Sequence, residues 1–581
     1  ELWEDNLISD DLLGSDASFG NFTVGLPGSW IGVKDDDWDD QDNWFDNTIP
    51  NQSKDVMIPA DVTYMPNITG TAITQNLTVY LNASLTISET GNLTTHGSFI
   101  NDGNFLIETN VDGKSGSFIN NGSLGGSGTF QFNRYLGSGD PGTHFGWHYV
   151  SSPVNNTVSG DFVGYWVKEY LPQGYNPNPG VTHNFKDIDP CIGCCSNPSQ
   201  FNISLQRMKG YSVKLDKSYT CSCESTGELI EFGGDHQDIS NCSAPTWCVP
   251  LNLATQKAYM TNINTGNITL GISGEGTKYN LVGNPYPSGW DFNTFKTGPN
   301  WPTGLNNAIY FWDEDADQYA SYVNGVSTNG GTNFVPPTQA FFLEADGTVP
   351  NINLTFTNAE RTHAGVNTYF KQSGDILKLK ASGDYYSDES VIRILSDAKA
   401  SWDGTYDAKK LFSLGETVPA LFTKAGELNL SINSLPENNS VPLYFTSLTG
   451  GNYSMEAIEN DFDQVYIEDK LNGNLHDLSS PYTFYHDPDN DEGRFVIHFN
   501  GISTESGEKG FVIYSNQNNV YVYSVDGELG EISIYNIVGQ YLTSVGLKEG
   551  LNILVLNDAS GYYIVKVQTD QNVITKKVYI H

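Results

Sequence analysis

The segment Leu85–Gly122, with the sequence LTISETGNLTTHGSFINDGNFLIETNVDGKSGSFINNG, decides the fold. Its apolar residues come in short groups, and Asn, Gly and Thr separate one group from the next. Groups of this kind are typical of short β-strands joined by turns. The heptapeptide GSFINDG at 97–103 returns nineteen residues later as GSFINNG at 116–122. A fixed period of this size is typical of a β-solenoid, in which each coil buries its apolar face on its neighbours.

The same pattern extends on both sides of this segment and predicts a short β-solenoid over about residues 50–135. Residues 1–49 are predicted to form an N-terminal cap rich in tryptophan and aspartate. Three tryptophans stand there among carboxylates: Trp30, Trp38 and Trp44 alternate with Asp35, Asp36, Asp37, Asp39, Asp40 and Asp42. In one interpretation the rings are buried at the end of a sheet while the carboxylates stay solvated, as charged runs usually do. In the other, the segment is a sugar-stacking or calcium-dependent surface.

The composition of the whole chain favours an all-β, multidomain protein. The 581 residues include 59 Gly, 25 Pro, 32 Tyr and 29 Phe, a mixture that favours strands and turns over helices. The 29 Lys and Arg against 68 Asp and Glu give a formal net charge of −39. Nucleic acid is therefore not an expected partner, because binding to phosphates needs clustered Lys and Arg. No apolar run reaches the ~20 residues of a transmembrane helix, so no transmembrane segment is expected.

A more distant duplication follows the predicted solenoid. The segment Val150–Pro153 matches Val282–Pro285 at a distance of 132 residues, and Lys209–Val213 matches Gln339–Leu343 at a distance of 130 residues. Two related β units are the simplest explanation. We predict the first at 136–278 and the second at 279–365.

All cysteines fall inside the first of these units. We interpret the segment that contains them, residues 191–248, as a loop insertion cross-linked by disulfides. Disulfides of this kind persist in oxidising compartments. A metal site built from the Cys191-x-x-Cys194 and Cys221-x-Cys223 pairs is the alternative, although two well-spaced CxxC pairs are missing. The seven disulfide candidates are Cys191, Cys194, Cys195, Cys221, Cys223, Cys242 and Cys248.

The last 200 residues read as two further β domains. Alternating runs such as Leu428–Ile432 and Phe495–Phe499 predict a β-sandwich over residues 366–505, because alternation puts one face in a core and one in water. One helical turn is expected around residues 407–412. Short strands separated by turns predict a small, Ig-like β-sandwich over residues 511–581.

The C-terminal module carries a resemblance to a known family. The features Ile534–Gln540, Gly550–Asn552, Gly561–Val567 and Thr575–Val578 follow one another in this order over about 70 residues. Together they resemble the C-terminal sorting domain (type A-like) of type IX secretion in Bacteroidota surface proteins. The chain departs from that pattern at residues 515–518, where the family often has a Pro-Asn-Pro turn.

This resemblance implies export by the type IX secretion machinery, which would be a partner of the chain. The protein would then be secreted or attached to the outer-membrane surface. Gly539, Gly561, Lys576 and Lys577 are the candidate sorting-signal residues, whereas the apolar residues of the module are expected to build its core.

The sequence carries no nucleophile elbow, phosphate loop or HExxH zinc motif, so hydrolases of these types are disfavoured and we predict a non-enzymatic protein. Calcium is the one small partner that the composition suggests, since hard cations take oxygen ligands. Neither loop has the bidentate Glu at the twelfth position of a full EF-hand, and solvated turns explain both loops. The candidate calcium ligands form two acidic loops: Asp313, Asp315 and Asp317, and Asp487, Asp489 and Asp491.

The leading functional hypothesis is a non-catalytic extracellular surface protein, adhesin-like or structural, exported through its C-terminal domain. The first alternative is a polysaccharide-binding protein, and a β-helix carbohydrate-active enzyme is the second. Extracellular polysaccharide or a cell-surface protein would be the partner. The candidate stacking residues are Trp30, Trp38, Trp44, Trp290 and Trp312.

Overall fold

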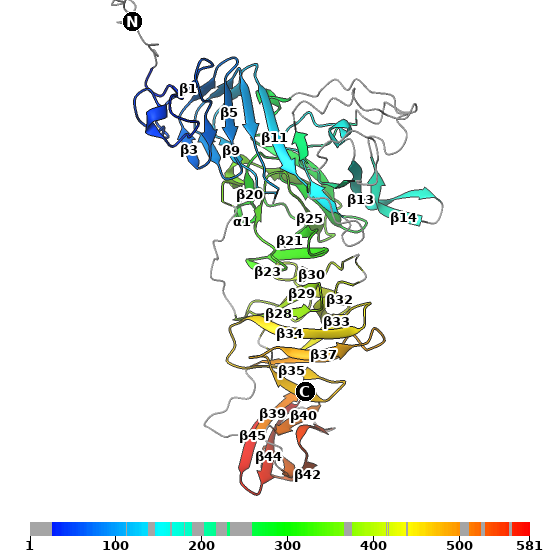
Figure 1. Cartoon of the computed structure of the whole chain (residues 1–581). Coiled ribbons are helices and arrows are strands. Elements are labelled where there is room, and N and C mark those ends of the chain that lie inside the picture. Colours follow the sequence, from blue (N-terminus) through cyan, green and yellow to red (C-terminus); the bar gives the residue numbers. More distant parts are fainter. Residues whose placement is uncertain are drawn as a thin grey trace, which may run out of the picture.

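The computed structural model describes residues 26–499 and 511–580 with gaps. The longer gaps are 137–145, 189–202, 216–228, 233–257, 365–374, 525–528 and 557–560. The described residues form an elongated column of β-strands, with the N-terminal strands at one end and the C-terminal module at the other (Figure 1). The predicted all-β class is confirmed. Among the described residues the one α-helix is α1 (Phe292–Thr297).

The predicted β-solenoid is present and has three faces, each a parallel sheet. The first face contains β1 (Val56–Ile58), β4 (Leu77–Val79), β7 (Phe99–Asn101) and β10 (Leu124–Gly125). The second contains β2 (Asn67–Ile68), β5 (Ser84–Ile87), β8 (Asn104–Ile107) and β11 (Thr129–Tyr135). The third contains β3 (Thr71–Thr74), β6 (Asn92–Thr95) and β9 (Ser117–Asn120).

The nineteen-residue repeat does not set the register of the coils. Phe99 pairs with Leu124 in β10, and Phe118 pairs with Leu93 in β6, so this coil advances by 25 residues. The two matching heptapeptides therefore lie on different faces of the same coil. Phe99, Phe105 and Phe118 come from the three faces, and their ring centroids lie 5.1 to 5.6 Å apart in the interior. The repeat reflects the shared need of each face for one inward-pointing aromatic ring.

Residues 29–44 add a partial coil that closes the N-terminal end of the solenoid. Ser29 bridges to Met57 and Asp37 bridges to Asn67, both in parallel. Trp30, Trp38 and Trp44 pack against one another with ring centroids 4.7 to 6.4 Å apart. Their side chains are at most 1% exposed, while most of the neighbouring aspartates lie at the surface. The interpretation of this segment as a buried cap is confirmed.

Each of the two duplicated units is built around an antiparallel sheet that holds the matching residues. The first sheet has the order β12 (Trp147–Val150), β15 (Tyr211–Leu215), β13 (Tyr165–Asn178) and β14 (Val181–Asp187). The second has the order β19 (Tyr279–Gly283), β25 (Ala340–Ala345), β21 (Leu305–Asp313), β22 (Gln318–Val323) and β23 (Val326–Thr328). Val150 pairs with Tyr211, and Val282 pairs with Phe341. The residues that match in the duplication thus occupy the same register.

The limits of these units differ from the predicted ones. The strand β18 (Ile268–Ser273) pairs with β26 (Asn351–Phe356), so the second unit starts before residue 279. The strands β16 (Leu229–Phe232) and β17 (Ala258–Tyr259) both pair with β11 of the solenoid. Part of the predicted first unit thus extends the second face of the solenoid. A small sheet of β24 (Phe334–Val335), β20 (Gly289–Asp291) and β27 (Arg361–Thr362) completes the second unit.

The next domain is one continuous sheet folded over its own core. Leu377, Met455 and Phe484 from one part of the sheet share a core with Leu443 and Ile497 from another. The expected helical turn at 407–412 is wrong, because Ala408 and Lys409 form the short strand β30 beside β32. The sheet order is β36 (Asn474–Asp477), β35 (Val465–Asp469), β38 (Phe495–Phe499), β33 (Ser440–Thr446), β31 (Ala420–Ala425), β32 (Leu428–Leu435), β29 (Ser387–Ile394), β28 (Asp375–Ser382), β34 (Gly451–Asn460) and β37 (Tyr482–His486).

The C-terminal module is a small sandwich of two antiparallel sheets with a core of its own. Ile513 and Val522 of one sheet are buried together with Ile534, Val565 and Val578 of the other. The first sheet is formed by β39 (Phe511–Asn516), β40 (Asn519–Ser524) and β43 (Gly550–Val555). The second is formed by β42 (Tyr541–Leu547), β41 (Gly530–Asn536), β44 (Gly561–Thr569) and β45 (Val573–Ile580).

Candidate functional site

Four of the five tryptophans singled out for sugar stacking are core residues. Trp30, Trp38, Trp44 and Trp290 are at most 1% exposed, and Trp290 stacks on Phe356 with ring centroids 4.1 Å apart. A sugar needs an open ring face, so the stacking prediction is wrong for these four. Trp312 is half-buried, with Tyr319 packed against it edge-on.

The acidic loops use their carboxylates to hold turns. Asp313 accepts a hydrogen bond from the Ala316 N–H, and burial raises the pKa of its carboxyl group. In the second loop Asp487 accepts from the Asp489 N–H, and Asp491 accepts from the Gly493 N–H. The described residues contain no cluster of three or more His, Cys, Asp or Glu side chains placed to hold a metal ion. Calcium binding at these loops stays a prediction.

The seven cysteines lie outside the described residues, so their pairing stays a prediction. The candidate sorting residues are described. Gly539 lies in the turn between β41 and β42 with φ of +84°, and Gly561 begins β44. Lys577 places its Nζ 3.9 Å from the Tyr562 ring centroid. Lys576 is more enclosed, and burial lowers the pKa of its amine to about 8.

The turn that contains Gly539 presents two apolar side chains that were expected in the core. Asn536 Oδ1 accepts hydrogen bonds from the N–H groups of Val538 and Gln540, which fixes the turn. Ile537 is 57% exposed and Val538 is 82% exposed. Sequence reasoning missed them because apolar residues beside a strand usually point inward. The C-terminal module therefore has an ordered, exposed apolar tip.

A buried arginine joins the solenoid to the second unit. Arg361 donates from Nη2 to the Phe118 carbonyl at 2.6 Å and from Nε to Ser288 Oγ at 3.1 Å. Its guanidinium also lies over the Tyr286 ring, and burial lowers its pKa to about 10. The Phe118 N–H in turn donates to the Pro287 carbonyl. The last coil is therefore tied to the unit that follows it.

His363 strengthens the same junction. Its two ring nitrogens lie 2.8 Å from Thr94 Oγ1 and from Ser117 Oγ, which belong to neighbouring strands of the third solenoid face. Burial and the nearby Arg361 lower the pKa of the imidazole to about 4. The ring is therefore neutral at neutral pH. The residue type and position gave no sequence signal for this contact.

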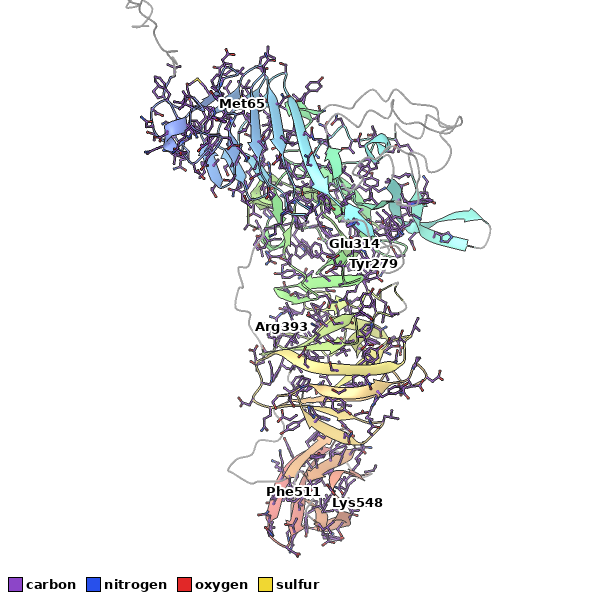
Figure 2. The ribbon with its side chains drawn as sticks, in the orientation of Figure 1. Met65, Tyr279, Glu314, Arg393, Phe511 and Lys548 are labelled. Carbon is purple, nitrogen blue, oxygen red and sulfur yellow. The ribbon has the colours of Figure 1, made fainter. Side chains whose placement is uncertain are left out.

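The units are also joined to each other and to the folded sheet. His148 Nε2 lies 2.8 Å from Glu314, which follows β21 of the second unit (Figure 2). At the start of β19, Tyr279 packs on Tyr310 and Phe342. Further along, Asn329 exchanges backbone and side-chain hydrogen bonds with Glu389 of β29. These contacts make one block of the chain from the tryptophan cap to the end of β38.

These features define an extended, multi-module all-β protein. A family model described as "Domain of unknown function (DUF8693)" matches residues 29–499, and the chain belongs to this family. The match starts at the cap and ends at β38, so it covers the joined block and stops before the C-terminal module.

The chain is also similar to the minor fimbrium subunit Mfa5 of Porphyromonas gingivalis. The two are 23% identical over 617 residues, which covers 94% of this chain and 46% of that protein. The chain thus spans about half the length of this curated relative. Within the described residues no helix is long and apolar enough to cross a bilayer.

Proposed function

We propose that the protein is a non-catalytic surface component, adhesin-like or structural, that acts outside the cell. The similarity to a minor fimbrium subunit carries this proposal, since that name describes a cell-surface appendage. The continuous block from residue 29 to 499 supports it, because a joined column of sheets holds its far end away from its point of attachment.

We further propose that residues 511–581 direct export through type IX secretion. The motif resemblance supports this route, and so does the separate core of the module. The exposed tip of Ile537 and Val538 is the surface that the machinery would contact, together with the predicted Gly539, Gly561, Lys576 and Lys577.

A reporter fused to residues 511–581 tests the export proposal in a host with type IX secretion. The intact fusion is expected outside the cell. Val538→Asp is expected to retain it in the periplasm without unfolding the module. Val573→Asp is the matched control, because Val573 is 55% exposed in the same module but lies away from the tip. Periplasmic retention of the intact fusion would rule the route out.

Polysaccharide binding is the second candidate function, and calcium is the proposed small partner of the two acidic loops. Retention of the full chain on a polysaccharide panel, with calcium and with chelator, tests both. Saturable binding to one glycan supports the second function, and its loss in chelator supports calcium. Uniform failure to bind leaves a protein-binding or structural role.

A further inference from the structure

A small cavity with a mostly apolar lining and a few polar side chains lies where the second unit meets the folded sheet. Its volume is about 130 Å³, well above the roughly 10–15 Å³ that one water needs. Gln318 comes from β22 of the second unit, whereas Lys410, Phe412 and Ala420 come from the folded sheet and the segment before β31. Leu448, in the turn after β33, also lines the cavity.

One wall of the cavity holds an unused hydrogen-bond acceptor. Gln318 is 6% exposed, and its Nε2 donates to the Ser387 carbonyl at 2.8 Å. Because a carbonyl can only accept, this bond fixes which end of the amide carries the oxygen. Within the described residues Gln318 Oε1 has no hydrogen-bond partner. A buried amide oxygen of this kind needs an N–H or O–H group from a ligand or from water.

Lys410 has unused hydrogen-bond donors and so needs an acceptor. This side chain is 8% exposed, and among the described residues its Nζ donates only to Asp388. An ammonium has three N–H groups, so two remain for a ligand. Asp388 itself also accepts from the Leu421 N–H and from Asn329 Nδ2. Its charge is therefore held in place beside the ammonium.

The charges around the cavity disfavour an anion. Asp388 balances Lys410, and the Asp317 carboxylate lies behind Gly415, where an added Cβ would come within 2.2 Å of it. A ligand that completes the hydrogen bonds of both side chains must accept from Lys410 Nζ and donate to Gln318 Oε1, and it must be electrically neutral. Hydroxyl groups do both at once.

A peptide strand has no edge to join here, because β31 is paired on both sides, with β32 and β33. The rim suits a compact ring instead: Phe412 is 40% exposed and Leu448 is 72% exposed. Their apolar surfaces can cover the C–H face of a sugar while its hydroxyls reach inward.

We infer that this cavity binds one neutral sugar unit through Gln318 and Lys410, with Phe412 and Leu448 against the ring. The inference rests on the proposed extracellular role and names a ligand class for it. The test titrates the full chain with glucose, galactose, mannose, fucose and N-acetylglucosamine and follows binding by calorimetry and ligand-observed NMR. Saturable binding of one sugar in the millimolar range is expected.

Two variants localise the site. Gln318→Met keeps the size of the side chain and removes the acceptor, together with the Nε2–H donor to the Ser387 carbonyl, so a lower melting temperature is expected for this variant. Leu448→Asp changes a rim residue that is 72% exposed and is expected to leave the melting temperature unchanged. Each variant is expected to weaken binding at least fivefold. Gln568→Met, at an exposed position in β44, is the control and is expected to bind normally.

Absence of saturable binding by every sugar overturns the inference, and so does binding that both variants leave unchanged. Saturable binding of a short unstructured peptide that Leu448→Asp abolishes would also overturn it, in favour of a peptide site. Surface exposure of the chain on intact cells is measured in the same strains. If the chain is exposed but binds no sugar, only this inference fails; if the chain stays inside, the proposed function fails.

Discussion

Met208 and Thr338 have the same left-handed backbone conformation, with φ of 65° and 63°, and they occupy matching positions in the two β units. The Thr338 carbonyl accepts a hydrogen bond from the Ser151 N–H at 2.8 Å, and the Met208 carbonyl accepts one from the Gly283 N–H at 2.9 Å. Ser151 and Gly283 match in the duplication as well. Each unit therefore gives the other the contact that it receives, as the two subunits of a symmetric dimer do.

Thr338→Gly is expected to stabilise the protein by about 1 kcal/mol. A β-branched residue in the left-handed region costs about 1–2 kcal/mol, and the buried Thr338 hydroxyl has no partner in the described part of the chain. The substitution removes the backbone strain and the unpartnered hydroxyl. Together these gains outweigh the loss of one buried methyl group, which costs about 0.8 kcal/mol. Urea unfolding measures the change.

Met208→Gly is the matched control, since it relieves the same conformation but empties a fully buried site. It is expected to destabilise by roughly 2–5 kcal/mol. Destabilisation of the protein by Thr338→Gly would show that the left-handed backbone of Thr338 stores no strain.

Gly122→Ala is expected to destabilise the solenoid by about 2 kcal/mol. An added Cβ would lie 2.0 Å from the Gly97 carbonyl oxygen of the adjacent coil, so the coils would have to separate. Gly125→Ala is the control, because nothing lies within 4 Å of its added Cβ. Thermal unfolding of both variants measures the difference, and a melting temperature that falls equally in both would contradict the coil spacing.

Arg361→Met is expected to uncouple the solenoid from the second unit and to cost about 3 kcal/mol. The substitution leaves the buried Phe118 carbonyl without its charged donor. Limited proteolysis should then cut between the two parts, while the parent chain stays resistant there. Lys296→Met, a half-buried cation of α1 outside this junction, should leave the proteolysis pattern unchanged. If the Arg361→Met variant resists cleavage, Arg361 does not hold the solenoid and the second unit together.

His363 should make the junction weaken in acid. Its folded pKa of about 4 lies below the unfolded value of 6.5, so the unfolded chain binds more protons between these values. Stability is therefore full above pH 6.5 and falls as the pH drops towards 4, by about 2 kcal/mol at pH 5. His363→Gln can keep both hydroxyl contacts, and its free energy of unfolding should not fall in this way between pH 7.5 and 5. An equal fall in both proteins would show that other titrating groups cause the pH dependence.

Local patterns in the sequence predicted strands and domains better than they predicted register and exposure. The heptapeptide repeat led to the correct solenoid but to the wrong coil length, because Phe99 and Phe118 serve different faces of one coil. The helix α1 was missed, although Asp291 caps it by accepting from the Asn293 N–H, a signal that the sequence contains.

The site residues were harder to predict because one composition serves two environments. Tryptophans among aspartates are typical both of a buried cap and of a sugar platform, and only packing separates the two. The contacts of Arg361 and His363 join segments more than 240 residues apart, and no local pattern encodes them. Ile537 and Val538 look like core residues until the Asn536 turn places them outside.

Surface exposure of the full chain on intact cells tests the central claim most directly. Cells that carry type IX secretion are treated with protease, and the chain is compared with the same chain lacking residues 511–581. The account predicts that the full chain is digested on intact cells, whereas the truncated chain is protected until the outer membrane is opened. Protection of the full chain on intact cells would contradict it.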